Sequence, residues 1–207
     1  MTNRKLGRMG VVAAVVTVTT GLAGTASASA PAAPQSVAPA AAAASVDYDV
    51  WAKDAKAAVD KGTAYVKERA AKAKEEKQAI VLDIDNTSLE THFHPLPPTP
   101  AVKPVLDLVK YADAQGVDVF FVTARPGIIN PVTKYNLKEV GYPVDGLYER
   151  GIGDLFGSVG EYKAAKRAEI EAKGYKIIAN VGNNDHDFAG GHAESTIKLP
   201  DYDGQLS

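Results

Sequence analysis

Residues 79–83, Ala-Ile-Val-Leu-Asp, constrain the possible folds of this 207-residue chain more than any other segment. The apolar run of residues 79–82 is bounded by polar residues and is typical of a strand that is covered on both faces, as strands of parallel sheets are. The run ends in Asp83, so the strand would deliver a carboxylate to its C-terminal edge. A parallel α/β sheet with an acid at one end is therefore the first prediction.

Strand and helix patterns alternate through the rest of the chain. Further strands are expected over residues 117–122, near 146–148 and over 176–181, and helices over residues 102–114, 130–140 and 162–172. This alternation predicts an α/β, Rossmann-like, doubly wound parallel sheet with helices on both faces. The loops after Leu82, Val122 and Val181 should converge on one crevice, because ligands of such sheets bind beyond the carboxyl ends of the strands.

An N-terminal helix is expected before the first strand. Apolar residues recur at near-helical spacing between residues 46 and 78, among many Lys and Glu, and Gly62 is expected to break the helix. Residues 88–100 are too few for a lid domain, and residues 125–160 hold little more than one helix and one short strand. We therefore expect a minimal cap and an open cleft.

The first residues have the pattern of an export signal. A basic start precedes an apolar run rich in Val and Ala, and the small residues a signal peptidase needs follow. We expect a signal peptide over residues 1–28, an Ala- and Pro-rich flexible linker over 29–45, and a single domain over 46–207. The alternative is a signal that is kept as a membrane anchor. A cleaved signal predicts a secreted protein with no stable membrane insertion.

Charge and cysteine content exclude some classes of function. Residues 1–28 contain three basic residues and no acidic ones, so the remainder has 20 Lys and Arg against 25 Asp and Glu, a net charge of −5. This balance argues against a nucleic-acid partner. The chain has no cysteine, which excludes disulfides and thiol catalysis.

Two acids separated by one residue, Asp83 and Asp85, stand where the first strand opens into a loop. With three later motifs, they make residues 80–202 resemble the haloacid dehalogenase (HAD) superfamily, and within it the plant-type and class B acid phosphatases. The motifs are Val-Leu-Asp-Ile-Asp-Asn-Thr at 81–87, Phe-Val-Thr-Ala-Arg-Pro at 121–126, Tyr-Lys-Ala-Ala-Lys-Arg at 162–167 and Val-Gly-Asn-Asn-Asp-His-Asp-Phe at 181–188. The segment Ile-Lys-Leu-Pro-Asp at 197–201 also resembles the end of members of this subfamily.

The resemblance implies roles for four catalytic residues. Asp83 would be the nucleophile that forms an aspartyl-phosphate. Asp85 would protonate the leaving oxygen and then deprotonate the attacking water. Thr123 and Lys163 would bind the phosphate, and Lys163 would also hold the Asp83 carboxylate.

The choice of Lys163 over the nearby Lys166 rests on spacing. The family pattern has a lysine, three further residues and an arginine, and Lys163 with Arg167 matches it. Taken without the resemblance, a lysine in such a basic helix indicates only a solvated face.

The resemblance also implies Mg²⁺ as the cofactor, bound by few protein oxygens together with waters and the substrate phosphate. The expected ligands are the side chain of Asp83, the backbone carbonyl of Asp85, Asn183 and Asp187, with Asp185 as a substitute. The family has an aspartate where this chain has Asn183. Because an amide oxygen carries no net charge, weaker metal binding is expected.

One loop aromatic, Phe93, lies shortly after the nucleophile. In related phosphatases, aromatic groups near the mouth of the site pack on the organic part of the substrate. Phe93 is therefore a candidate substrate-binding residue, with packing inside its own domain as the alternative.

The sequence thus predicts a secreted, Mg²⁺-dependent phosphomonoesterase of the acid phosphatase type, acting on a small phosphomonoester. Two alternatives remain open. One is a non-catalytic secreted binding or storage protein that retains the fold, which Asn183 favours and the presence of Asp83 disfavours. The other is a phosphotransferase that passes the phosphate to an alcohol through the same residues.

Overall fold

The computed structural model describes residues 45–206, so the predictions for the signal peptide and most of the linker lie outside the described residues. The described chain contains one five-stranded parallel sheet in the order β3-β2-β1-β4-β5. The strands are β1 (Gln78–Leu82), β2 (Asp118–Pro126), β3 (Gly146–Arg150), β4 (Lys176–Gly182) and β5 (Thr196–Lys198). The prediction of a parallel α/β sheet is confirmed.

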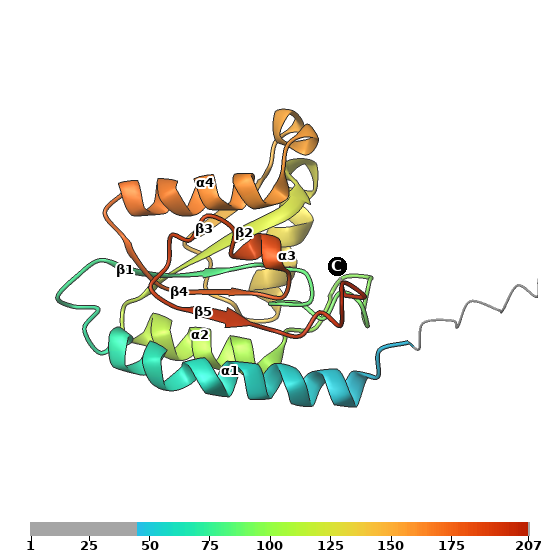
Figure 1. Ribbon diagram of the computed structural model, residues 1–207, viewed down its shortest axis with the longest axis horizontal. Coiled ribbons are helices and arrows are strands. Elements are labelled where there is room, and N and C mark those ends of the chain that lie inside the picture. Colours follow the sequence, from blue (N-terminus) through green and yellow to red (C-terminus); the bar gives the residue numbers. More distant parts are fainter. Residues whose placement is uncertain (1–44, 207) are drawn as a thin grey trace, which may run out of the picture. The chain divides into compact units, whose positions relative to one another are not determined.

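Helices cover both faces of this sheet. Figure 1 shows α4 on one face and α1 with α2 on the other. The α-helices are α1 (Tyr48–Ala70), α2 (Lys103–Ala114), α3 (Asn130–Glu139) and α4 (Val159–Ala172), and the 3₁₀ helices are η1 (Gly127–Ile129), η2 (Ile152–Phe156) and η3 (Asp185–Asp187). The doubly wound arrangement and the N-terminal helix are as predicted.

Strand β1 separates two apolar cores. Ile80 and Leu82 belong to the larger core, which α1 and α2 cover, whereas Ala79 and Val81 belong to the smaller core with Ile170 of α4. Successive side chains of a strand point to opposite faces, and here both faces are covered. This is why β1 has a continuous apolar sequence instead of an alternating one.

Helix α1 is continuous, so the predicted break near Gly62 is wrong. Asp47 caps the start of α1 by accepting a hydrogen bond from the backbone N–H of Val50 at 3.0 Å. A Cβ on Gly62 would lie 2.5 Å from Cδ1 of Ile197 in β5. The glycine therefore allows α1 to approach the sheet closely and does not interrupt the helix.

The strand predictions needed two corrections. Strand β5 was missed because it is only three residues long, with Ile197 buried between two exposed neighbours. Strand β2 was expected to end at Val122 but continues to Pro126, which pairs with Arg150 of β3 after a shift in register. The Thr-Ala-Arg sequence at 123–125 thus belongs to an irregular extension of the strand. Among the described helices, none combines the length and the apolar character needed to cross a membrane.

Candidate functional site

A small pocket of about 190 Å³ lies beyond the carboxyl ends of the central strands. It is lined by Asp83, Asp85, Ala124, Lys163, Asn183, Asn184, His186 and Leu206. The loops after β1 and β4 and the extension of β2 each contribute to it. The expected convergence of these segments on one crevice is therefore present.

Lys163 joins two carboxylates at the base of this pocket. Its Nζ lies 2.5 Å from Oδ1 of Asp83 and 2.5 Å from Oδ1 of Asp187. Lys163 and Asp187 have side chains that are each 2% exposed, and that of Asp83 is 9% exposed. Transferring a charged side chain from water into the protein interior costs free energy. The ion pairs of Lys163 with Asp83 and Asp187 offset this cost only because their atoms lie at hydrogen-bonding distance.

Burial and the neighbouring charges shift the pKa values of Asp83 and Lys163. Burial raises the pKa of Asp83, the Lys163 ammonium acts in the opposite direction, and the Asp187 carboxylate raises it further. Burial lowers the pKa of Lys163, but the attraction of Asp83 and Asp187 outweighs this effect and leaves it raised. Lys163 therefore stays positively charged beside Asp83.

Asp187 is held from several sides. Its Oδ2 accepts a hydrogen bond from the backbone N–H of Asn184 at 2.9 Å, and its backbone carbonyl accepts from Arg167 at 2.6 Å and from Asn180 at 2.8 Å. A Cβ on Gly182 would lie 2.4 Å from Oδ2 of Asp187. Asp187 can approach β4 this closely only because a glycine stands there.

Asn183 is also buried, beside the same pocket. Its Oδ1 accepts a hydrogen bond from the Thr87 hydroxyl at 3.2 Å, and its Nδ2 donates to the carbonyl of Leu206 at 3.1 Å. The amide is therefore held by the loop after β1 on one side and by the end of the described chain on the other.

Asp85 has a different partner from Asp83. Arg125 binds it through two hydrogen bonds, Nη2 to Oδ1 at 2.7 Å and Nε to Oδ2 at 3.0 Å. The Asp85 side chain is 43% exposed. Arg125 stands inside the 121–126 motif, but no role was predicted for it. The two acids thus face separate cations, one buried and one near solvent.

Three predicted site residues, Asp187, Thr123 and Phe93, are not among those that line the small pocket. Thr123 is fully buried in β2, where its hydroxyl accepts a hydrogen bond from the backbone N–H of Arg125 at 3.2 Å. Phe93 packs on α1, with ring centroids 4.9 Å from Trp51 and 5.1 Å from Tyr48. The substrate-binding roles of Thr123 and Phe93 stay predictions.

The oxygen atoms at this pocket suit a magnesium ion. Asp83, which carries a carboxylate, and Asn183, which carries an amide oxygen, both line it. Mg²⁺ prefers a small number of such oxygen ligands, completed by water. Among the described residues no cluster of three or more His, Cys, Asp and Glu could hold a metal ion. The expected ligands are the Asp83 carboxylate, the Asn183 amide and the Asp85 backbone carbonyl. They include only one carboxylate side chain, so they would not form such a cluster.

The other acids of the 181–188 motif have partners of their own. Both carboxylate oxygens of Asp187 are engaged, one by Lys163 and one by the Asn184 backbone. Asp185, the substitute ligand, has a side chain that is 96% exposed and pairs with Lys198 at 2.7 Å. Asn183 lines the small pocket together with Asp83, whereas Asp185 and Asp187 are not among its lining residues. Of the three, Asn183 is therefore the residue that borders the same space as Asp83.

A second pocket of about 380 Å³ shares Asp85 with the first. Its lining is Asp85, Thr91, Pro95, Pro97, Thr99, Arg125, Ile129, Val132 and Asn136. The Thr99 backbone and the Asn136 side-chain amide satisfy each other, since Asn136 accepts from the Thr99 N–H and donates to its carbonyl, both at 2.8 Å. Asp85 thus borders both the small pocket and the larger one.

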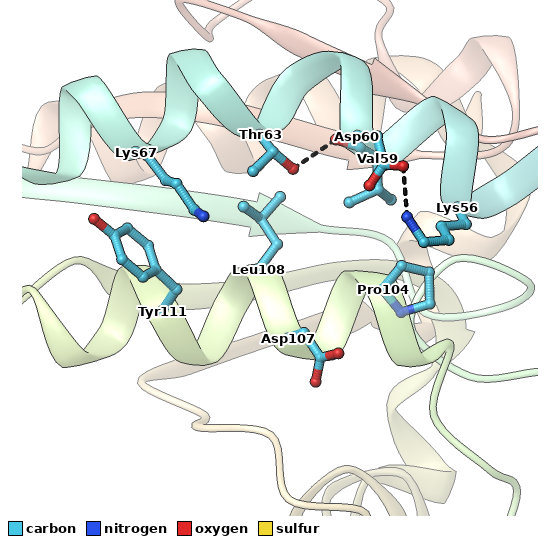
Figure 2. A pocket seen from close by; sticks show the side chains of 9 residues that line it. All are labelled: Lys56, Val59, Asp60, Thr63, Lys67, Pro104, Asp107, Leu108 and Tyr111. Carbon is cyan, nitrogen blue, oxygen red and sulfur yellow. Dashed lines mark hydrogen bonds and ion pairs between the residues drawn. The ribbon is translucent and has the colours of Figure 1, made fainter.

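A hollow of about 390 Å³ lies away from this site, between α1 and α2 (Figure 2). Its charged groups have partners: Lys56 pairs with Asp60 at 2.6 Å, Lys67 lies over the Tyr111 ring at 5.1 Å from its centroid, and Asp107 pairs with Lys103, outside the lining, at 2.7 Å. Nothing in this lining resembles a nucleophile with an activating partner, so it is not a candidate active site.

A comparison with known protein families finds a match that covers most of the chain. The chain matches the family model for the HAD superfamily, subfamily IIIB (acid phosphatase), over residues 7–94 and 98–205. No curated protein matches the chain.

Solved structures resemble its fold. The class C acid phosphatase from Bacillus anthracis is 24% identical, with a TM-score of 0.56 over 74% of this chain and 82% of that chain. The same phosphatase with tungstate bound has 20% identity and a TM-score of 0.59, over 75% of this chain and 80% of that chain. A chain of the Pnkp1/Rnl/Hen1 RNA repair complex has 17% identity and a TM-score of 0.52, over 62% of this chain and 44% of that chain.

Proposed function

The chain belongs to subfamily IIIB of the HAD superfamily, the acid phosphatases, and from this premise we propose that it is a Mg²⁺-dependent phosphomonoesterase that acts through an aspartyl-phosphate on Asp83. The observation that carries the proposal is the buried contact of Lys163 with Asp83 and Asp187. A phosphoryl group is negatively charged and repels a carboxylate nucleophile. A fixed ammonium beside that carboxylate reduces the repulsion.

The proposed reaction has two steps. In the first, an oxygen of Asp83 bonds to phosphorus as the bond to the leaving oxygen breaks, and Asp85 gives that oxygen a proton. In the second, Asp85 takes a proton from a water that attacks phosphorus. The bond between phosphorus and Asp83 then breaks, which releases inorganic phosphate and restores Asp83.

Magnesium would be held by the Asp83 carboxylate, the Asn183 amide oxygen and the backbone carbonyl of Asp85. When bound, it supplies positive charge to the phosphate oxygens. Lys163 supplies a second positive charge beside Asp83, and Asp187 orients that lysine.

Arg125 is the proposed link between substrate binding and the position of Asp85. In the structure the guanidinium makes two hydrogen bonds to the Asp85 carboxylate. Guanidinium groups bind phosphate as well as carboxylate. An arriving phosphate therefore competes with Asp85 for Arg125, and the Asp85 carboxyl is then available to contact the leaving oxygen.

The larger pocket is the proposed position of the leaving group, because Asp85 borders both pockets. Its size suits a small phosphomonoester. The similar fold of a class C acid phosphatase that was solved with tungstate supports an oxyanion site, because tungstate, like phosphate, is a tetrahedral oxyanion. The export pattern of residues 1–28 supports a secreted protein, and the net charge of −5 that remains without them disfavours nucleic-acid substrates.

Release of phosphate from 4-nitrophenyl phosphate over a Mg²⁺ series tests the proposal. Turnover should require Mg²⁺, and Asp83→Asn should lower it by at least about 10³-fold, since a covalent nucleophile is lost. Asp107→Asn, the same change on the outer face of α2, should leave turnover within about twofold. An acceptor alcohol added to the assay distinguishes phosphate transfer from hydrolysis.

A second candidate function is favoured by Asn183, which offers a metal no charge. If the wild type releases no phosphate at saturating Mg²⁺ and at several acidic pH values, the phosphomonoesterase proposal is wrong. The non-catalytic binding protein is then the better description.

A further inference from the structure

The carbonyl oxygen of Leu206 joins the two loops that carry the candidate site. It accepts hydrogen bonds from Nδ2 of Asn86 at 2.6 Å and from Nδ2 of Asn183 at 3.1 Å. Asn86 follows the nucleophile in the loop after β1, and Asn183 follows β4. A carbonyl oxygen has two lone pairs, and here each is used by one of these amides.

The segment that delivers this carbonyl is firmly attached to the domain. The Leu206 side chain is 1% exposed and lies in the larger core. Its backbone N–H donates to Asp201 at 3.2 Å, and the hydroxyl of Tyr202 donates to Asp54 of α1 at 2.9 Å. Tyr202 and Asp203 have φ angles of +50° and +55°, which non-glycine residues adopt only when other contacts compensate. The position of the carbonyl is therefore set by packing.

A backbone carbonyl fixes the orientation of an amide in a way that a hydroxyl does not. The Thr87 hydroxyl, which contacts Oδ1 of Asn183, is able to donate or to accept, so it tolerates either orientation. The Leu206 carbonyl only accepts, so it must face the NH₂ group of Asn183. Oδ1 of Asn183 then faces Thr87. The hydrogen bond from the Thr87 hydroxyl occupies one lone pair of Oδ1, and the second lone pair stays available.

We propose that the Leu206 carbonyl is a positioning group for the metal ligand Asn183: it holds the amide so that its oxygen, and not its NH₂, is presented to Mg²⁺. The proposal rests on the function proposed above. A carboxylate has no hydrogen to donate, so an aspartate at this position would set two acceptors about 3 Å apart.

Hydrogen exchange of side-chain amides, measured by NMR without Mg²⁺, tests the positioning directly. Leu206→Ala removes the side chain that anchors the carbonyl, and Leu108→Ala in α2 is the matched loss of a buried leucine away from the site. The NH₂ groups of Asn183 and Asn86 should exchange about tenfold faster in Leu206→Ala and at the wild-type rate in Leu108→Ala. Equal exchange rates in the two variants would overturn the proposal, whether or not the protein is a phosphatase.

Calorimetric Mg²⁺ titration supplies the second measurement. Partners that orient metal ligands typically change affinity by 10- to 100-fold, so Leu206→Ala should weaken Mg²⁺ binding by about tenfold and Leu108→Ala should not. Asn183→Asp should gain more Mg²⁺ affinity in the Leu206→Ala background than in the wild type, because only there is the opposing carbonyl released. An equal gain in both backgrounds would show that the carbonyl does not act on residue 183, and the proposal would fail.

Discussion

Lys163 shows how a single buried charge organises the candidate site at the residue scale. Its spacing before Arg167 singled it out from the basic residues around it, and the structure places its Nζ between Asp83 and Asp187. Sequence alone could not assign Arg125 to Asp85. That pairing depends on the extension of β2 past Val122, which the sequence pattern did not show.

Replacing Lys163 should show how strongly the two buried carboxylates destabilise the fold when no cation lies beside them. Lys163→Met keeps the length of the side chain but leaves Asp83 and Asp187 facing each other without a cation. The free energy of unfolding at pH 7 should fall by about 3 kcal/mol, as when one partner of a buried ion pair is removed. Urea unfolding measures this change.

The matched control is Lys166→Met on the same helix, where the lysine is part-exposed and pairs with Glu169 at the surface. It should change the stability by less than about 0.5 kcal/mol. A loss below about 1 kcal/mol for Lys163→Met would mean that the triad is not held as the structure shows.

At the scale of elements, close packing between a helix and the sheet explains a feature that the periodicity of the sequence did not predict. The strongly apolar strands β1 and β4 were predicted with bounds within two residues of those observed, because their patterns are local. Gly62 was misjudged because its lack of a side chain serves a contact with Ile197, far away in the sequence. The short β5 was missed because three residues with one buried side chain carry no detectable period.

Gly62→Ala separates helix propensity from packing. Propensity alone predicts a gain of about 1 kcal/mol, since alanine is the better helix former. The new Cβ would lie 2.5 Å from Ile197, however, and overpacking typically costs about 1–3 kcal/mol. We expect a net loss of about 1 kcal/mol in thermal or urea unfolding.

Gly153→Ala serves as the comparison for this variant, because a Cβ there meets no atom within 4 Å. Its stability should stay within about 0.5 kcal/mol of the wild type. If Gly62→Ala were instead stabilising, α1 would not pack on β5 as closely as described.

At the scale of the whole molecule, a charged cluster ties α1 to the sheet. Arg69 of α1 donates to Glu194, just before β5, at 2.6 and 2.9 Å, and pairs with Glu76, just before β1, at 2.5 Å. Tyr65 also donates to Glu194, at 2.9 Å. These contacts connect segments from both ends of the described chain on the side opposite the candidate site.

The cluster predicts a pH dependence of stability. Hydrogen bonding to Arg69 lowers the pKa of Glu194 below its ordinary value of 4.5. A carboxyl with a lowered folded-state pKa stabilises the fold above its unfolded-state pKa and loses this contribution as the pH falls. Glu194→Gln should therefore cost about 0.5 kcal/mol at pH 7, a surface magnitude, and progressively less below pH 4.5.

Urea unfolding at a series of pH values measures this difference. Glu68→Gln, an exposed change on the same helix as Arg69, should show no such trend. If the stability difference between Glu194→Gln and the wild type stays constant from pH 7 to acidic pH, the ionised Glu194 carboxylate is not its source.

The sequence by itself determined the alternation of strands and helices and the placement of acids at strand ends, because these follow from local periodicity and from the burial of parallel strands. Only the tertiary structure decided which groups meet there. Lys163 reaches Asp83 from 80 residues away, and the Leu206 carbonyl reaches Asn86 from 120. Such contacts depend on how helices and loops pack on the sheet, and no local pattern encodes that packing.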